Sequence, residues 1–407
     1  MQAEWYLALR FLREGRAQTA LIIIGAATGV AVMVFITALI TGLQETIIER
    51  TLGTQAHIVV RPPDEIVREL LASRSPGVVV ASRIEEPAQR VQSIDQWQRV
   101  DRQLSRLGGV VAVSPMASGS AFAVRGNASR SVALIGIDAE RYTRVVPIRD
   151  HLVEGRYSLA GTDALIGTEL AGDLGVVLGG RVRVGTADGR AQIFTVRGIF
   201  DLGIEDLNAR WVVVSLRNAQ TLLDLVGGAS SIDLKVSDVF EADRVADRIE
   251  ERTGLDAQSW MERNAELMVA LRSQSASSTI IVVFVMIAVA MGIASVLIVS
   301  VVQRARQIGI LRAMGAPRGR VLRIFLIQGG VVGVAGAILG SAIGAALAQL
   351  FTALVRDAEG EPLFPVALDA GIFASTLLIA TATGVASAFF PARHASRLDP
   401  AVAIRHE

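Results

Sequence analysis

The chain has 407 residues, of which 51% are hydrophobic and 19% charged, and its formal net charge at pH 7 is +1. The balanced charge offers no basic field for nucleic acid, and the absence of cysteine excludes disulfides, thiolate metal sites and cysteine nucleophiles. The single lysine, Lys235, lies in SSIDLKVSD, which lacks the glycine frame of a nucleotide-binding P-loop. This chain alone is therefore not a Walker-type ATPase, and an ATP-driven function needs a second polypeptide.

The N-terminal region predicts a helix at the membrane surface followed by a membrane span. Residues 1–16 form an amphipathic pattern with three arginines, which predicts a cytoplasmic helix. The apolar run 17–43 is too long for the hydrophobic part of a signal peptide, so we predict a retained first transmembrane helix. Within it, Gly25 and Gly29 form a GxxxG pair that favours close helix packing.

Residues 44–272 differ in character, because charges return at ordinary density and apolar runs shorten. Short apolar runs alternate with amphipathic helical patterns, which predicts an α+β domain in two subdomains with a helical stalk at each end. The first span starts at a basic cytoplasmic end, so this domain is expected outside the cytoplasm. Val110–Ser114 and Ser118–Val124 are predicted as two strands.

A basic stretch, 303–323, lies between two predicted transmembrane helices, 273–302 and 324–355. It carries six arginines and no acid, which is typical of a cytoplasmic loop under the positive-inside rule. Arg306–Met314 predicts a short amphipathic helix that ends at Gly315. One face of this helix is expected to be apolar and to contain Ile308, Ile310, Leu311 and Met314. Two interpretations stay open at this point: a basic elbow that faces lipid, or an element that docks a cytoplasmic partner.

The third span carries glycines at a spacing of about four residues, which leaves one face nearly without side chains. We expect that face to pack against another helix, in this chain or a partner, through Gly333, Gly336, Gly340 and Gly344. A short outer loop, 356–369, leads to a fourth span at 370–390. The arginine-containing tail 391–407 is predicted to be cytoplasmic. The fold class is thus a membrane α-helical protein with four transmembrane helices, arranged 1 + 3, and a large α+β extracytoplasmic domain between the first and second helices.

The sequence offers little support for chemistry of its own. The four histidines are scattered without a metal-binding spacing, and no GxSxG motif is present. No acidic residue lies within a predicted span, which argues against a transporter driven by protons or ions. We therefore expect no catalytic residue and no metal site, and a mechanical role.

The stretch RQIGILRAMGAPRGRVLRIFLIQG resembles the coupling-helix region of the MacB/LolC/LolE/FtsX superfamily of ABC transporter permeases, also called type VII. The C-terminal segment PARHASRLDPAVAIRHE is similar to that superfamily's ending, and the domain pattern around GTELA resembles its extracytoplasmic domain. IQGGVVGVAGAILGSAIGAALA is closest to the lipoprotein-releasing LolC/LolE type. The chain departs from many members in having Gln307 and Gln328 where they have Glu.

The resemblance implies a multi-pass protein of the bacterial inner membrane with both termini in the cytoplasm. Its function would be that of a permease subunit that releases lipoproteins toward the outer membrane. The alternatives are a mechanotransmission permease of a MacB-like tripartite exporter and, with less support, a signal transmitter that transports nothing. The implied partners are two cytoplasmic ATPase subunits, a second permease copy or a related permease, and a periplasmic lipoprotein chaperone or adaptor. ATP and magnesium would bind the ATPase, and no cofactor would bind this chain.

The resemblance also implies roles for particular residues. The residues expected to couple to the ATPase are Arg306, Gln307, Ile308, Gly309, Leu311, Arg312, Met314 and Gly315. In a lipoprotein-releasing system the substrate's acyl chains would lie between the first two spans. The expected lining residues are Val30, Val34, Leu39, Ile287, Met291 and Val296, with ordinary lipid-facing or packing residues as the alternative interpretation.

Overall fold

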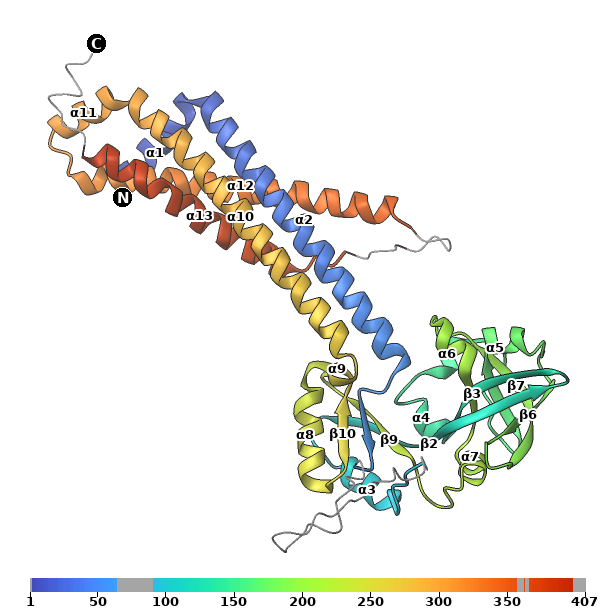
Figure 1. Ribbon diagram of the computed structural model, residues 1–407. Helices are drawn as coiled ribbons and strands as arrows, with labels where there is room; N and C mark the ends of the chain where they lie inside the picture. The colour runs from blue at the N-terminus through green and yellow to red at the C-terminus, as the bar shows by residue number, and fades with distance from the viewer. Residues whose placement is uncertain (1, 64–90, 357–361, 363–365, 398–407) are drawn as a thin grey trace, which may run out of the picture. The chain divides into compact units, whose positions relative to one another are not determined.

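The computed structural model describes residues 2–63, 91–356, 362 and 366–397 (Figure 1). Its contacts divide the chain into two units. The membrane unit comprises Met1–Ile48 and Val269–Glu407, and the insert domain comprises Glu49–Met268. The predicted outer loop and C-terminal tail lie partly outside the described residues.

Four long apolar helices dominate the membrane unit (Figure 1). They are α2 (Arg16–Thr54), α10 (Ala265–Gln303), α12 (Arg318–Leu354) and α13 (Ala370–Ser396). Each has the length and hydropathy to cross a bilayer, and a helix satisfies its backbone polar groups without water. Two short helices join them: α1 (Gln2–Glu14) precedes α2, and α11 (Ala305–Ala313) lies between α10 and α12. The membrane α-helical fold class is confirmed.

The glycines of α12 hold two other helices at backbone distance. A Cβ atom at Gly340 would lie 2.5 Å from the carbonyl oxygen of Ala27 in α2, and Gly336 and Gly344 meet α2 in the same way. A Cβ atom at Gly333 would lie 2.8 Å from the carbonyl oxygen of Ala380 in α13. Residues without side chains thus let α12 pack closely against α2 on one side and α13 on another.

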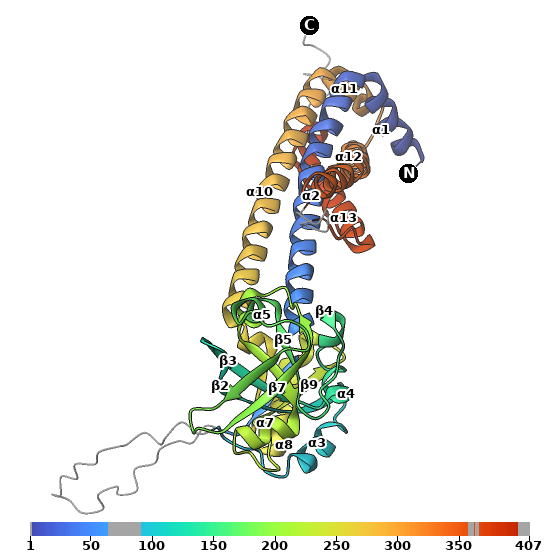
Figure 2. The ribbon, with the colours of Figure 1, turned by 90° about the vertical axis from the view of Figure 1, so that its right-hand side faces the viewer.

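The two glycines of the GxxxG pair in α2 have different surroundings. A Cβ atom at Gly29 would lie 2.2 Å from Cγ2 of Val289 in α10, and the two helices run side by side (Figure 2). Gly25 is exposed and has nothing within 4 Å of its Cβ position. Among the described residues, only Gly29 of this pair serves close helix packing.

The insert domain is built on one ten-stranded sheet. Its strands are β1 (Ile58–Arg61), β2 (Val110–Arg125), β3 (Ala128–Ile137), β4 (Leu152–Gly155), β5 (Asp163–Gly167), β6 (Arg181–Gly185), β7 (Ala191–Phe200), β8 (Trp211–Ser215), β9 (Ser231–Val236) and β10 (Asp256–Ser259). Its helices include α3 (Trp97–Leu104), α4 (Ala139–Tyr142), α5 (Thr168–Asp173), α6 (Glu205–Arg210), α7 (Leu216–Leu222), α8 (Ala242–Thr253) and α9 (Trp260–Arg263).

Strand β2 belongs to two parts of this sheet (Figures 1 and 2). Pairing runs β2–β3–β8–β5–β7–β6 and returns to β2, which closes a six-stranded ring. The N-terminal half of β2 pairs with β9 and extends the sheet through β1 to β10. Alternation along β2 separates the two faces, since Ala117, Ala121 and Ala123 enter the core of the ring, while Ser118, Ser120 and Phe122 lie on the other face.

The structure corrects the prediction of two strands around Pro115, because Val110–Arg125 is one continuous strand. At Pro115 the strand pairs with β9, while the pairing with β3 begins only at Met116. A proline, which has no N–H to donate, is tolerated where one side of the strand has no partner.

The close contact between α12 and α2 predicts a large effect of side chains at Gly340. Gly340→Val should destabilise the purified protein by about 1–3 kcal/mol, because the new methyls would overlap the α2 backbone. Gly25→Val in the facing helix is the matched control and should leave the melting temperature in lipid nanodiscs unchanged. Equal melting temperatures for both variants would contradict the packing described here.

Candidate coupling site

The chain leaves α10 and enters α12 through a helix with sharp ends. Arg304 has non-helical backbone angles, φ −107° and ψ 10°, and separates α10 from α11. At the other end Gly315 has φ +88°, a conformation that favours glycine. Pro317 then precedes the first turn of α12. These breaks set α11 apart as a separate short element.

One side of α11 packs into the membrane unit. Ile308 is 1% exposed and contacts a cluster that includes Val321 and Phe325 of α12 and Ala392 of α13. Gly309 is also buried. Arg312 donates a hydrogen bond of 3.2 Å from Nη1 to the Ser396 carbonyl oxygen at the end of α13. These contacts attach α11 to two of the long helices.

The opposite side of α11 is open and mixes apolar with polar side chains. Ile310 is 45% exposed and Met314 73%, and Arg306, Gln307 and Gly315 are exposed as well. The expectation of a single apolar face therefore needs correction. Ile308 points inward while Ile310 and Met314 point outward, and Leu311 is intermediate.

Helix α1 packs against the start of α12 rather than standing alone at a membrane surface. Ala8 and Phe11 are buried against Ile324 of α12, with Leu311 of α11 packed at the edge of the cluster. Trp5, Tyr6 and Leu9 lie on the exposed side of α1. An amphipathic helix of this kind can contact protein on one side and the membrane interface on the other.

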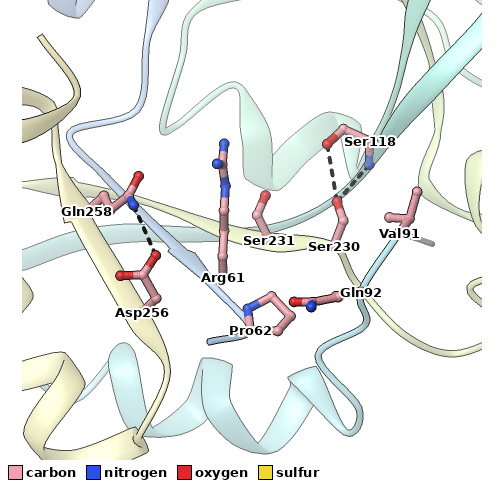
Figure 3. A pocket seen from close by; sticks show the side chains of 9 residues that line it. All are labelled: Arg61, Pro62, Val91, Gln92, Ser118, Ser230, Ser231, Asp256 and Gln258. Carbon is pink, nitrogen blue, oxygen red and sulfur yellow. Dashed lines mark hydrogen bonds between the residues drawn. The ribbon is translucent and has the colours of Figure 1, made fainter. Parts of the chain in front are cut away.

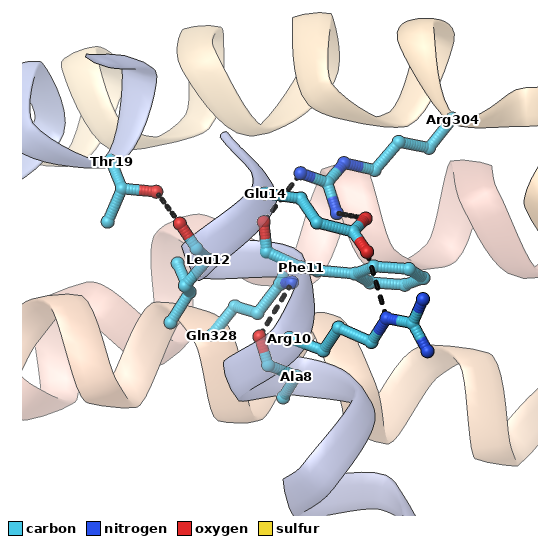
Figure 4. A network of polar contacts seen from close by, with 8 residues as sticks. All are labelled: Ala8, Arg10, Phe11, Leu12, Glu14, Thr19, Arg304 and Gln328. Atoms are coloured by element: carbon cyan, nitrogen blue, oxygen red, sulfur yellow. Dashed lines mark hydrogen bonds and ion pairs between the residues drawn. The ribbon is translucent and has the colours of Figure 1, made fainter. Parts of the chain in front are cut away.

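Arg304 connects the α10–α11 break to α1 (Figure 4). Its Nη2 donates a hydrogen bond of 2.5 Å to the carbonyl oxygen of Phe11, and its guanidinium carbon lies 4.7 Å from the centre of the Phe11 ring. Its Nη1 lies 3.9 Å from the Glu14 carboxylate. Burial lowers the pKa of Arg304 from its usual value, and the nearby Glu14 carboxylate opposes that shift. A hydrogen bond and a cation–π contact thus hold the charge in place.

Further polar contacts tie α1 and α2 to the same region. Gln328 of α12, 2% exposed, donates a hydrogen bond of 3.4 Å to the Ala8 carbonyl oxygen (Figure 4). Gln18 of α2 donates one of 2.8 Å to the side chain of Gln303. A glutamate at position 328 could not donate to a carbonyl unless protonated, so glutamine suits this buried contact.

The residues expected to line a substrate path divide into two groups. Val30 and Val34 are at most 1% exposed and pack beside Gly340 and Gly344 of α12. Their role as lining residues stays a prediction. The other four residues are more accessible. Leu39 and Val296 are partly buried, Ile287 is 50% exposed, and Met291 is 69% exposed.

The sequence interpretation missed the anchoring role of Arg304. Two features of the sequence could have indicated this role. An arginine follows directly after a long apolar segment, and the amphipathic N-terminal helix had no assigned partner. The interpretation also grouped all six arginines as a basic loop, whereas Arg304 and Arg312 donate hydrogen bonds within the membrane unit and Arg323 forms an ion pair with Glu4 of α1.

Loss of the Arg304 contacts should release α1. In Arg304→Gln the backbone amides of residues 5–14 should exchange with deuterium roughly tenfold faster, the effect of a lost charged hydrogen bond. Arg306→Gln, which removes the same charge from an exposed position two residues away, should leave that exchange unchanged. Hydrogen exchange with mass spectrometry measures both. Identical exchange in the two variants would contradict an anchoring role.

Comparison with known proteins places this architecture in a family. The model of the MacB-like periplasmic core domain matches residues 19–252, more than half of the chain, and that of the FtsX-like permease C-terminal domain matches residues 279–400. The lipoprotein-releasing system transmembrane protein LolC of Neisseria meningitidis is 23% identical over 99% of each chain. The macrolide export ATP-binding/permease protein MacB of Sodalis glossinidius is 27% identical over 99% of this chain and 60% of its own.

Among solved structures, the periplasmic region of MacB from Actinobacillus actinomycetemcomitans is 16% identical over 55% of this chain and 95% of its own, with a TM-score of 0.34. The two family models together span both units of the chain, and the LolC relative matches its full length. The chain belongs to the FtsX/MacB-type, or type VII, permeases of ABC transporters.

Proposed function

We propose that this permease extracts or releases lipoproteins from the bacterial inner membrane toward the outer membrane. The observation that carries the proposal is the match to lipoprotein-releasing LolC proteins along the whole chain, including one from Xylella fastidiosa that is 25% identical over 98% of each chain. These two LolC relatives are matched over 98% or more of their own length, and the MacB relative over 60% of its own.

The proposal places both termini in the cytoplasm and the insert domain in the periplasm. Support comes from charge, since the arginines of α1, of the stretch 303–323 and of the C-terminal end of α13 would all face the cytoplasm in this orientation. The site where α11 meets α1 would then be open to cytoplasmic proteins.

A separate cytoplasmic ATPase would bind the exposed side of α11 and supply ATP hydrolysis with bound magnesium. Ile310 and Met314 offer an apolar contact area, with Arg306 and Gln307 beside them. The opposite side of α11 is attached to α12 through Ile308 and to α13 through Arg312. A force applied to α11 would therefore reach the spans through packed contacts rather than through a flexible loop.

Two ATPase subunits and a second permease, identical or related, would complete the transporter, with a periplasmic chaperone or adaptor receiving the substrate. This chain would not be an enzyme and would bind no cofactor. The exposed residues Ile287 and Met291, and the partly buried Leu39 and Val296, remain proposed contacts for acyl chains, since they offer apolar surface on α2 and α10.

A second candidate function is that of a MacB-like tripartite exporter, in which the spans act as a lever and the insert domain moves a periplasmic substrate. The match of the MacB-like periplasmic core model to residues 19–252 favours it. The two functions differ in where the substrate binds, since only lipoprotein release requires acyl chains between the spans.

Charge on the open side of α11 should uncouple the transporter. Ile310→Asp and Met314→Asp should each reduce lipoprotein release from proteoliposomes containing the partner ATPase at least tenfold, because a carboxylate would be buried at the contact. Both side chains are exposed, so the permease should keep its melting temperature.

Val226→Asp places the same charge at an 87% exposed valine of the insert domain and serves as control. Normal release with all three variants would refute docking at α11. Release that fails even for the unaltered protein, while a non-acylated substrate is exported, would favour the exporter function.

A further inference from the structure

In the insert domain, the face of the sheet that lies outside the six-stranded ring carries a hollow. Its lining is polar at one end and apolar at the other. Two adjoining cavities, of about 330 and 340 Å³, share Arg61 and Ser118 in their walls. The strand register explains why their lining residues meet. Val59 lies opposite Asp233 on β9 and Gln258 on β10, so these side chains share one face. By the pairing of the neighbouring strands, the same face also carries Met116 and Ser118 of β2, Ile135 and Ala133 of β3, and Trp211 of β8.

The first cavity is polar (Figure 3). Arg61 extends between Gln258 on one side and Ser231 on the other. The Ser230 hydroxyl oxygen accepts a hydrogen bond of 2.8 Å from the backbone N–H of Ser118 and lies 3.2 Å from its hydroxyl. Arg61 is exposed, and its side chain forms no ion pair or hydrogen bond with any residue that the structure describes. Its donors are therefore available to a ligand with acceptor oxygens.

The second cavity combines charges with an apolar wall. Met116, Ile135 and Trp211 belong to the hydrophobic cluster outside the six-stranded ring and form the wall. Asp233, 3% exposed, and Arg263 line the polar end. Arg263 donates a hydrogen bond of 3.4 Å to Gln55 but forms no ion pair within the described part of the chain.

This arrangement selects for a particular ligand chemistry. Two guanidinium groups face one buried carboxyl group in the second cavity, so positive charge prevails there. In the first cavity the Asp256 carboxylate, which is paired with Gln258, lies opposite Arg61 in the strand register, so the anion is expected at the end of the hollow where Arg61 and Arg263 meet. The backbone groups beneath the hollow are already paired in the sheet, so recognition must come from side chains rather than from strand addition. Arginine is suited to carboxylate, sulfonate and phosphate groups, and the tryptophan and methionine wall is suited to a hydrocarbon body.

We propose that the hollow between Arg61 and Trp211 binds a small amphiphilic anion, with the anionic group at Arg61 and Arg263 and the apolar body against Met116, Ile135 and Trp211. The proposal goes beyond the transport function proposed above, because the residues that line both cavities belong to the insert domain and none belongs to α11. Thr54, the last residue of α2, lies in the wall of the second cavity.

Binding of octanesulfonate to the full-length protein in nanodiscs tests this site, with empty nanodiscs as the blank. Calorimetry should detect one saturable site, which weakens roughly tenfold in Arg61→Gln and in Arg263→Gln, as expected for a lost charged hydrogen bond. Arg106→Gln removes the same charge from an exposed position in the same domain and should leave the affinity unchanged. Melting temperatures verify that each variant is folded.

Two comparison ligands sharpen the test. Octyl glucoside lacks the charge and inorganic phosphate lacks the hydrocarbon body, so each should bind at least tenfold more weakly than octanesulfonate. Equal affinity for octyl glucoside, equal affinity for phosphate, or equal affinity of the Arg61→Gln variant and the unaltered protein for octanesulfonate would each overturn the proposal.

The same site should bind anions more tightly at lower pH. Burial raises the pKa of Asp233 to about 6, against the opposing effects of Arg263 from α9, Arg61 from β1 and the neighbouring Ser231 and Tyr142 groups. Between pH 7.5 and 5.5 Asp233 takes up a proton and ceases to repel an anion, while a sulfonate stays charged. Octanesulfonate affinity should therefore rise as the pH falls. Asp233→Asn should remove most of that rise, and an unchanged rise in this variant would contradict the assignment.

Discussion

The membrane unit depends on the close approach of α12 to its neighbours. Gly336, Gly340 and Gly344 admit the backbone of α2, and Gly329 and Gly333 admit that of α13. Because hydrocarbon supplies no hydrophobic force between helices, contact at backbone distance has to provide much of the cohesion through van der Waals packing. The fixed position of α12 in turn determines where α1 and α11 attach, since both pack against its first turns through Ile324 and Val321.

The coupling site follows from that arrangement. Arg304 ends α10 and binds the last turns of α1, while Ile308 and Arg312 bind α11 to α12 and α13. Each contact is internal to the membrane unit, so the short helix has one side committed to the bundle and one side open. In the insert domain the single strand β2 belongs both to the closed ring and to the sheet that continues through the three strands β9, β1 and β10. The hollow around Arg61 lies on the face of that shared sheet.

Much of this fold could be predicted from the sequence, because hydrophobic runs and arginine positions report directly on membrane spans. The segment containing α11 could be predicted from the glycine and proline that end it. Which side of α11 faces the bundle could not, because Ile308 and Ile310 are equally apolar and only the position of α12 and α13 separates them. The hollow in the insert domain depends on strand register, which brings together residues as distant as Arg61 and Trp211, and no local pattern encodes it.

The most direct test of the central claim uses the absence of cysteine from this chain, which makes any introduced cysteine unique. A benzophenone maleimide attached to Met314→Cys or Ile310→Cys would be photo-activated in membranes that contain the partner ATPase. The account predicts a cross-link to the ATPase from both positions and none from Val177→Cys, an exposed site in the insert domain. A cross-link from Val177→Cys, or none from either α11 position in a complex that hydrolyses ATP, would contradict docking at α11.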